Sequence, residues 1–400
     1  MKGLVRHHDH SKHGHSHHHA GGLPGHPDAN IPGRQAGAEF VPRVLAWELT
    51  RRCNLNCIHC RATASMQAPE GELTLDEYKK LTDDIASFSS PIIILTGGEP
   101  LLRPDLYQIA DYVTNKGLRA AVSTNGTLVT EEVAKRLKEV GVNASSISID
   151  GSTAAIHDDF RQQPGAFEAS VRGMKIFKDA GIKVQVNTSL TRRNLHDLEP
   201  IHDLVKKLGA DAWHVFMLVP TGRGGEAGQA ELITADDYER TLNRIYEWNR
   251  DEAMEIKPTC SPQYYRILRQ RAKQDGIPVD VEHFGLNART RGCLAGVGFG
   301  FVSYRGEVYP CGYYPILSGN IREKSFREIW EKSELMTKLR DFKGYGGSCG
   351  KCGYIRVCGG CRARHTRACA REPARLTSDS SKLESVATVM KSSFGGDDSL

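Results

Sequence analysis

Short apolar runs alternate with amphipathic segments between residues 41 and 218, and this alternation restricts the fold more than any other feature of the chain. Six runs have the length of buried strands: residues 45–49, 91–96, 119–124, 145–150, 183–188 and 212–218. The segments between them have helical periodicity: residues 74–87, 104–116, 130–140, 166–180 and 194–208. Strands that alternate with helices form parallel sheets. We therefore predict an α/β fold, a (β/α)6 sheet curled into a partial, TIM-like barrel, with its chemistry at the carboxyl ends of the strands.

Three cysteines follow the first predicted strand at the spacing CxxxCxxC: Cys53, Cys57 and Cys60. A structural zinc site normally uses four protein ligands, which three thiolates do not provide. Three thiolates suit a [4Fe–4S] cluster whose fourth iron stays open to a ligand from outside the protein. The spacing therefore favours an iron–sulfur site over zinc or plain buried thiols.

This motif, followed downstream by Thr96-Gly-Gly-Glu-Pro100, resembles the radical S-adenosylmethionine (SAM) superfamily. The resemblance implies that the open iron chelates SAM and that the reduced cluster cleaves the sulfonium to a 5′-deoxyadenosyl radical. Cys53, Cys57 and Cys60 would then be the catalytic ligands.

Polar residues at the ends of the predicted strands, with one arginine, are the candidates for binding SAM. They are Gly97, Gly98, Glu99, Ser123, Asn125, Ser148, Asp150, Asn187 and Arg161. The two glycines would let the backbone approach the ligand, Glu99 would pair with the SAM ammonium, and Arg161 would pair with its carboxylate. Helix capping or turn formation is the alternative role for each polar side chain.

A second group of cysteines lies in the C-terminal part of the chain: Cys293, Cys311, Cys349, Cys352, Cys358, Cys361 and Cys369. Repeated CxxC pairs also occur in zinc ribbons. After a radical SAM core, however, they resemble the SPASM extension, which holds auxiliary [4Fe–4S] clusters.

The family pattern implies one or two auxiliary clusters. Cys293, Cys311 and Cys361 would serve the first, and Cys349, Cys352 and Cys358 the second. Cys369 is a metal-ligand candidate, but the sequence departs from the family from His365 onward, which leaves the fourth ligand of the second cluster open. Cys260 lies outside both patterns; it is either a core thiol or a residue with a substrate-side or cluster-ligand role.

The expected organisation has five parts. These are a disordered His-rich tail (1–40), a radical SAM core (41–255), a helical bridge (256–290), a SPASM domain (291–375) and a second disordered tail (376–400). The histidines of the first tail either bind a metal or heme iron, or belong to a spacer.

Stretches at residues 46–55, 94–105, 219–224, 259–266 and 305–312 resemble the heme-synthase branch of SPASM proteins. That resemblance implies oxidative decarboxylation of two propionates of iron-coproporphyrin III to vinyl groups, giving heme b. It also implies an electron donor such as ferredoxin or flavodoxin. Heme d1 biosynthesis, didecarboxysiroheme deacetylation, peptide maturation and metal storage remain alternatives.

A substrate with several carboxylates calls for cations at the barrel mouth. The candidates are Arg61, Arg223, Arg266 and Arg269.

Composition excludes several classes of protein. The formal charge of +5 over 400 residues comes without a basic run interleaved with aromatics, so we expect no nucleic-acid partner. No apolar stretch reaches the roughly 18 residues of a membrane span, and the start lacks the apolar segment of a secretory signal. Eleven cysteines without a secretory signal point to metal clusters rather than disulfides, and to the reducing cytoplasm.

Overall fold

The computed structural model describes residues 40–226 and 229–364, which lie within one compact unit, Gly37–Leu400. The two predicted tails fall outside the described residues, apart from Phe40.

One ten-stranded sheet organises the described chain, in the order β10-β9-β8-β1-β2-β3-β4-β5-β6-β7. Its strands are β1 (Val44–Glu48), β2 (Ile92–Thr96), β3 (Arg119–Thr124), β4 (Ala144–Ser148), β5 (Lys183–Leu190), β6 (Ala212–Met217), β7 (Glu255–Thr259), β8 (Phe299–Val302), β9 (Glu307–Tyr309) and β10 (Gly319–Asn320). Neighbours from β8 through β1 to β7 are parallel, whereas β9 and β10 are antiparallel. All six predicted strands are present, and the α/β fold with a mostly parallel sheet is confirmed.

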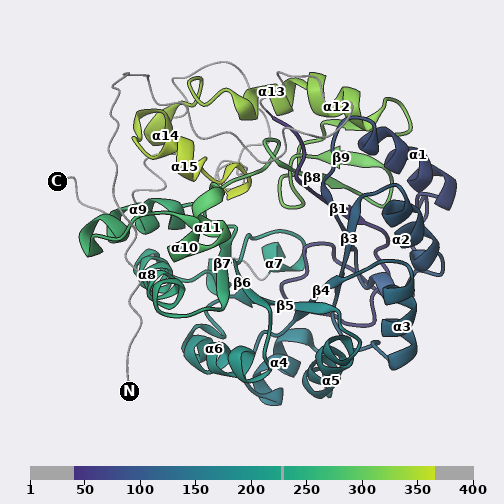
Figure 1. The fold of residues 1–400 in the computed structure, drawn as a ribbon, viewed down its shortest axis with the longest axis horizontal. Helices are drawn as coiled ribbons and strands as arrows, with labels where there is room; N and C mark the ends of the chain where they lie inside the picture. The colour runs from purple at the N-terminus through teal and green to yellow at the C-terminus, as the bar shows by residue number, and fades with distance from the viewer. Residues whose placement is uncertain (1–39, 227–228, 365–400) are drawn as a thin grey trace, which may run out of the picture. The chain divides into compact units, whose positions relative to one another are not determined.

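Helices cover the outer side of the sheet, so that β1–β7 lie inside a ring of helices (Figure 1). The helices of the first part of the chain are α1 (Leu75–Ala86), η1 (Pro100–Leu102), α2 (Leu106–Asn115), α3 (Glu131–Glu139), α4 (Ala154–Arg161), α5 (Ala166–Asp179), η2 (Leu195–Asp197), α6 (Leu198–Lys207), α7 (Arg223–Glu226), η3 (Gln229–Glu231) and α8 (Ala235–Asp251). Those that follow are α9 (Tyr264–Asp275), α10 (Val281–Phe284), α11 (Leu286–Arg289), α12 (Phe326–Lys332), α13 (Glu334–Arg340), α14 (Gly347–Lys351) and α15 (Ile355–Cys358). The α1 helix begins with a capping box, because Glu77 N donates to Thr74 Oγ1 and Thr74 N donates to Glu77 Oε2.

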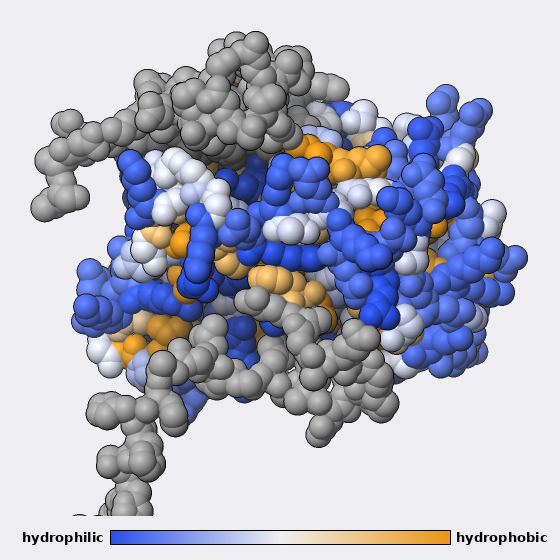
Figure 2. All heavy atoms as spheres, turned by 90° about the horizontal axis from the view of Figure 1, so that it is seen from above, coloured by the Kyte–Doolittle hydropathy of each residue, from blue (hydrophilic) through white to orange (hydrophobic). Residues whose placement is uncertain are grey.

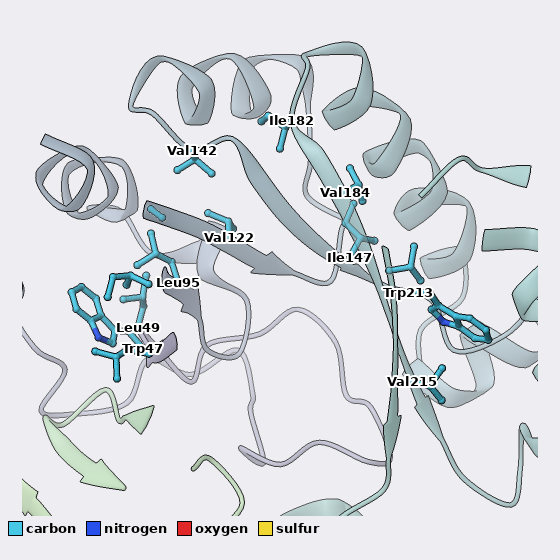
Figure 3. Close-up of a cluster of buried hydrophobic side chains, with 14 of the residues drawn as sticks. Trp47, Leu49, Leu95, Val122, Val142, Ile147, Ile182, Val184, Trp213 and Val215 are labelled. Carbon is cyan, nitrogen blue, oxygen red and sulfur yellow. The ribbon is translucent and has the colours of Figure 1, made fainter. Parts of the chain in front are cut away.

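The two faces of the sheet differ in polarity. Alternate strand residues such as Leu95, Val184 and Trp213 are fully buried, and they pack in the apolar layer between the sheet and the helices (Figure 3). The residues between them point to the inner face, because successive strand side chains lie on opposite sides. On β4–β7 these inner residues include several polar ones and are only partly buried.

Four strands were not predicted. β7 takes the first residues of the expected helical bridge, and the alternation at Glu255–Thr259 is obscured by two charged residues and by Pro258. Proline is tolerated because β7 is an edge strand. β8, β9 and β10 come from the cysteine-rich region and extend the sheet beyond β1.

No helix in the described ranges is long and apolar enough to cross a membrane. Figure 2 shows hydrophilic residues over much of the visible face, with apolar ones in separate patches.

Candidate active site

Cys53, Cys57 and Cys60 lie together in the loop that follows β1, at the carboxyl end of the sheet. We call residues 53–65 the cysteine loop. Cys53 and Cys57 are buried and Cys60 is partly buried. Each sulfur accepts a hydrogen bond, from Leu55 N to Cys53 Sγ (3.4 Å), from Ala64 N to Cys60 Sγ (3.5 Å) and from Arg161 Nη1 to Cys57 Sγ (3.6 Å). Such donors stabilise negative charge on sulfur.

These cysteines fit an iron–sulfur cluster better than a single ion. Three thiolates leave a structural zinc ion one protein ligand short. In a [4Fe–4S] cluster each thiolate binds a different iron, so no shared centre is needed. Burial raises the pKa of the Cys53 thiol to about 12 and also raises that of Cys57. The thiolates therefore need the positive charge that iron provides.

Gly97 and Gly98 allow the backbone before the cysteine loop to lie directly against the end of β2. Gly98 N donates to Thr50 O and Glu99 N to Arg52 O, both at 2.7 Å. A Cβ atom on Gly97 would lie 2.4 Å from Thr50 O, and one on Gly98 would lie 2.2 Å from Arg52 O. Both distances are far below contact distance, so the glycines are required by this close approach as well as by the predicted approach to SAM.

The Glu99 side chain is fully buried and is held by β3. Thr124 Oγ1 donates to Oε1 at 2.8 Å, and Asn125 N donates to Oε2 at 2.8 Å; Leu101 N donates to Oε1 at 3.1 Å. Burial raises the pKa of Glu99 to about 7 despite these donors. Both oxygens thus have protein partners, and the expected contact with the SAM ammonium stays a prediction.

Asn125 connects the end of β3 to the cysteine loop. Its Nδ2 donates to Asn54 Oδ1 at 2.9 Å and lies 3.9 Å from Cys53 Sγ. Thr127 N and Oγ1 donate to its Oδ1 at 2.9 and 2.7 Å. The amide group is therefore fixed in orientation beside a cluster ligand.

Arg161, at the end of α4, bridges the cysteine loop and β4. It forms a buried ion pair with Asp150, whose Oδ1 also accepts from Ser189 N at 2.6 Å. Its other contact is Cys57 Sγ, and its Nε has no hydrogen-bond partner among the described residues. Arg161 was predicted to pair with the SAM carboxylate; the structure gives it an internal carboxylate instead, and a direct contact with SAM remains a prediction.

Ser123, Ser148 and Asn187 all lie on the inner face of the sheet, as the strand alternation requires. Ser146 Oγ donates to Ser123 Oγ at 2.8 Å, and Gln185 Nε2 donates to Asn187 Oδ1 at 2.6 Å. The structure thus brings these three predicted SAM ligands to one side of the sheet.

Two of the four predicted substrate arginines lie in or against the cysteine loop. Arg223 donates from Nε to Cys57 O at 3.0 Å and from Nη1 to Ala64 O at 2.8 Å, so it clamps the loop. Arg61 pairs with the buried Glu48 at 2.7 Å and lies over the Phe301 ring of β8.

The other two arginines lie on α9. Arg266 forms an ion pair with Glu239 of α8 at 2.6 Å, and Arg269 Nη1 donates to Tyr265 O at 3.1 Å. Arg223 Nη2, in contrast, is buried without a hydrogen-bond partner among the described residues, and the carboxylate-binding role of the four arginines stays a prediction.

The auxiliary cysteines divide into two groups, and the first group has four members rather than three. Cys260, Cys311 and Cys361 pack together in one cluster, and Cys293 is close enough to interact electrostatically with each of them. Burial, followed by the neighbouring Cys361, raises the pKa of Cys260 to about 12. The sequence left the role of Cys260 open, because Cys293 lies 33 residues further along the chain and no spacing rule connects the two.

The second group contains Cys349, Cys352 and Cys358, and Cys358 interacts electrostatically with the other two. Arg362 Nη2 donates to Cys349 Sγ at 3.2 Å. Cys369 lies outside the described residues.

Gly359 and Gly360 separate the two groups by adopting positive φ angles of 80° and 63°, values that only glycine adopts readily. The turn directs Cys358 to one group and Cys361 to the other.

Two family descriptions match this chain. The radical SAM superfamily matches residues 47–205, and the iron–sulfur cluster-binding SPASM domain matches residues 293–362. An AdoMet-dependent heme synthase of Methanosarcina barkeri is 51% identical over 81% of this chain and 92% of its own length. This chain belongs to the radical SAM superfamily.

A second relative of this radical SAM protein, the AdoMet-dependent heme synthase of Oleidesulfovibrio alaskensis, is 49% identical over 86% of the chain and 88% of its own length. The fold is similar to that of Streptococcus suis SuiB bound to S-adenosylmethionine, with a TM-score of 0.63 at 15% identity over 82% of this chain and 75% of that one. The [4Fe–4S] cluster, SAM and a C-terminal iron–sulfur domain follow from this membership.

Sequence reasoning missed Arg364. Arg364 Nη2 donates to Met217 O at 2.9 Å and to Leu218 O at 3.0 Å, and Nη1 donates to Cys260 O. It ties the cysteine-rich region to the ends of β6 and β7. An isolated arginine in a basic segment carries no sequence signal for such a contact.

We predict that Gly98→Ala destabilises the protein by about 3 kcal/mol, because the new Cβ collides with Arg52 O and the cysteine loop must move. Urea unfolding and iron content measure the effect, and iron should fall with stability. Gly298→Ala is the matched control, since its Cβ has no neighbour closer than 3.7 Å. Equal stability of the two variants would contradict the packing argument.

Glu99 should make stability fall as the pH rises. Its folded pKa of about 7 lies above the ordinary glutamate pKa of 4.5, so the unfolded chain releases the proton first and stability is lost between these values. The loss is on the order of 3 kcal/mol and levels off above pH 7. Urea unfolding from pH 4.5 to 8 should show a flatter profile for Glu99→Gln.

Glu131→Gln, at an exposed first-turn position of α3, serves as the control for Glu99→Gln and should keep the wild-type slope. A Glu99→Gln profile as steep as the wild type would show that another group titrates.

Proposed function

We propose that this chain is a heme synthase that oxidatively decarboxylates two propionates of iron-coproporphyrin III to vinyl groups, giving heme b. The observation that carries the proposal is the identity of about half the residues to heme synthases along most of both chains. The identity supports the synthase activity, whereas the substrate and the two decarboxylations come from the resemblance of the sequence motifs.

Cys53, Cys57 and Cys60 would hold the cluster, and the polar ends of β2–β5 would hold SAM. Bound there, the reduced cluster supplies the electron that cleaves SAM to a 5′-deoxyadenosyl radical. Asn125 and Arg161 fix the loop and stabilise charge on Cys53 and Cys57. Ser123, Ser148 and Asn187 offer hydrogen bonds to SAM on the inner face.

Each propionate loses one hydrogen atom from its β-carbon, carbon dioxide and one electron as the vinyl group forms. Breaking an unactivated C–H bond is beyond side-chain acids and bases, so the cofactor carries this chemistry. The electron needs an acceptor, and an auxiliary cluster provides one. A reducing partner such as ferredoxin or flavodoxin would supply the electron for SAM cleavage.

The four grouped cysteines Cys260, Cys293, Cys311 and Cys361 support a complete first auxiliary cluster that acts as this acceptor. Cys349, Cys352 and Cys358 would hold the second cluster, for which Cys369 remains the candidate fourth ligand. Arg61 supports a short path for electrons between the SAM-binding cluster and the first auxiliary cluster. It follows Cys60 in sequence, and its Nη1 lies 3.4 Å from Gly312 O, next to Cys311.

Reduced, reconstituted protein incubated with SAM and iron-coproporphyrin III tests the proposal. We expect two successive losses of carbon dioxide and hydrogen in the product mass, through a monovinyl intermediate, with one 5′-deoxyadenosine formed per vinyl group. The Cys53→Ala/Cys57→Ala/Cys60→Ala variant should form no 5′-deoxyadenosine while iron in the C-terminal region persists. SAM cleavage without porphyrin turnover would favour heme d1 biosynthesis, deacetylation or peptide maturation.

Replacement of a first-group cysteine tests the electron acceptor. Cys260→Ala should lose about four iron atoms and stop vinyl formation while SAM cleavage continues, as should Cys311→Ala. Cys369→Ala is the control and should retain activity. Iron content, electron paramagnetic resonance and product mass distinguish the outcomes; the opposite pattern would assign the acceptor to the second group.

A further inference from the structure

Four polar residues form one lateral row across β4–β7. Backbone register pairs Ser148 with Asn187, Asn187 with His214, and His214 with Lys257. Neighbouring strands lie about 4.8 Å apart, so the row is about 14 Å long. It runs from the proposed SAM ligands to an edge strand that the sequence did not reveal.

The row lies on the inner face of the sheet. The residues before its members, Ile147, Val186, Trp213 and Ile256, are fully buried in the apolar core. Side chains alternate along a strand, so Ser148, Asn187, His214 and Lys257 point away from the helices. All four are partly buried rather than closed off.

Lys257 is a cation without a close protein partner on the inner face of the sheet. Within the described chain, no hydrogen bond or ion pair engages its Nζ, although Glu255 lies on the same face two residues away. Burial lowers the pKa of Lys257, while Glu255 raises it. A partly buried ammonium gains free energy when an anion binds to it, because the lost hydration is replaced.

His214 complements this cation with a neutral donor. Burial, followed by repulsion from Lys257, lowers the pKa of His214 to about 3, so the ring is neutral near pH 7. A neutral imidazole keeps one N–H donor. A carboxylate has two oxygens, and this pair offers one ammonium and one N–H.

We propose that Lys257 and His214 form a subsite that binds a carboxylate of the tetrapyrrole substrate on the inner face of the sheet. The inference rests on the proposed function, since it assigns a site to one of that substrate's propionates. It adds a cation to the four arginines predicted from the sequence, of which Arg61 and Arg266 are paired with Glu48 and Glu239.

The position suits the chemistry. Ser148 and Asn187, proposed to hold SAM, belong to the same row as His214 and Lys257. A carboxylate held at Lys257 would anchor the macrocycle beside SAM and bring a neighbouring propionate to the radical. Lys257 is thus a positioning residue rather than a catalytic one.

Binding of metal-free coproporphyrin III to the full-length protein, followed by fluorescence, tests the subsite. Without iron, the histidines near the N-terminus have no metal to ligate. We expect Lys257→Met to raise the Kd about tenfold or more, the effect of losing one charge-assisted hydrogen bond. Lys257→Arg should restore most of the affinity. Lys175→Met, at an exposed position on α5, is the control and should leave the Kd unchanged.

The tetramethyl ester of coproporphyrin III separates charge recognition from general damage. Its carboxylates are neutral, so Lys257→Met and the wild type should bind it equally. Equal weakening for the acid and the ester would mean that Lys257 only supports the fold, and an unchanged Kd for the acid would mean that it does not contact substrate; either result overturns the subsite. A wild type that binds neither porphyrin would overturn the proposed substrate and the subsite together.

Discussion

The position of the cysteine loop depends on one backbone contact, the approach of residues 50–52 to Gly97 and Gly98. The loop contains no helix and no strand of the sheet, and its own backbone hydrogen bonds, such as Cys53 N to Ser65 O at 2.8 Å, join the loop to itself rather than to the sheet. Two N–H groups at the end of β2 donate to the chain just before Cys53, and the missing side chains leave room for this. Because β2 is a central strand of the sheet, the cysteine loop is attached to a rigid part of the core.

Three arginines then connect the loop to other parts of the fold, with Arg161 buried and Arg61 and Arg223 partly buried. Arg223 binds its carbonyl groups, Arg161 binds a cysteine sulfur and Asp150, and Arg61 binds Glu48. A guanidinium group suits such contacts, since its five N–H donors satisfy several acceptors at once. Lys257 of β7 differs from them, because no hydrogen bond or ion pair engages its Nζ within the described chain.

The C-terminal cysteine-rich region is part of the same sheet as the radical SAM region, because β8, β9 and β10 extend that sheet. β8 pairs with β1, the strand that leads into the first cysteine loop. Arg364 binds the ends of β6 and β7, and Arg61 reaches Gly312. Cys260 and Cys311 are therefore placed by the same sheet that places Cys53. A fixed separation of this kind suits electron transfer between two metal sites.

The resemblance to the SPASM extension implied the division of the later cysteines into two groups. The sequence by itself determined the six alternating strands, the α/β class and the first cysteine motif. These features depend on local periodicity and short spacings, which act through neighbouring residues. Only the tertiary structure decided that Cys260 joins a group far away in sequence, that the predicted substrate arginines have internal partners, and that Lys257 shares a row with Asn187 and His214. Such relations depend on which strands lie side by side and in what register. Pro258 and the charges of β7 concealed that strand, because an edge strand with one partly exposed face need not show a continuous apolar run.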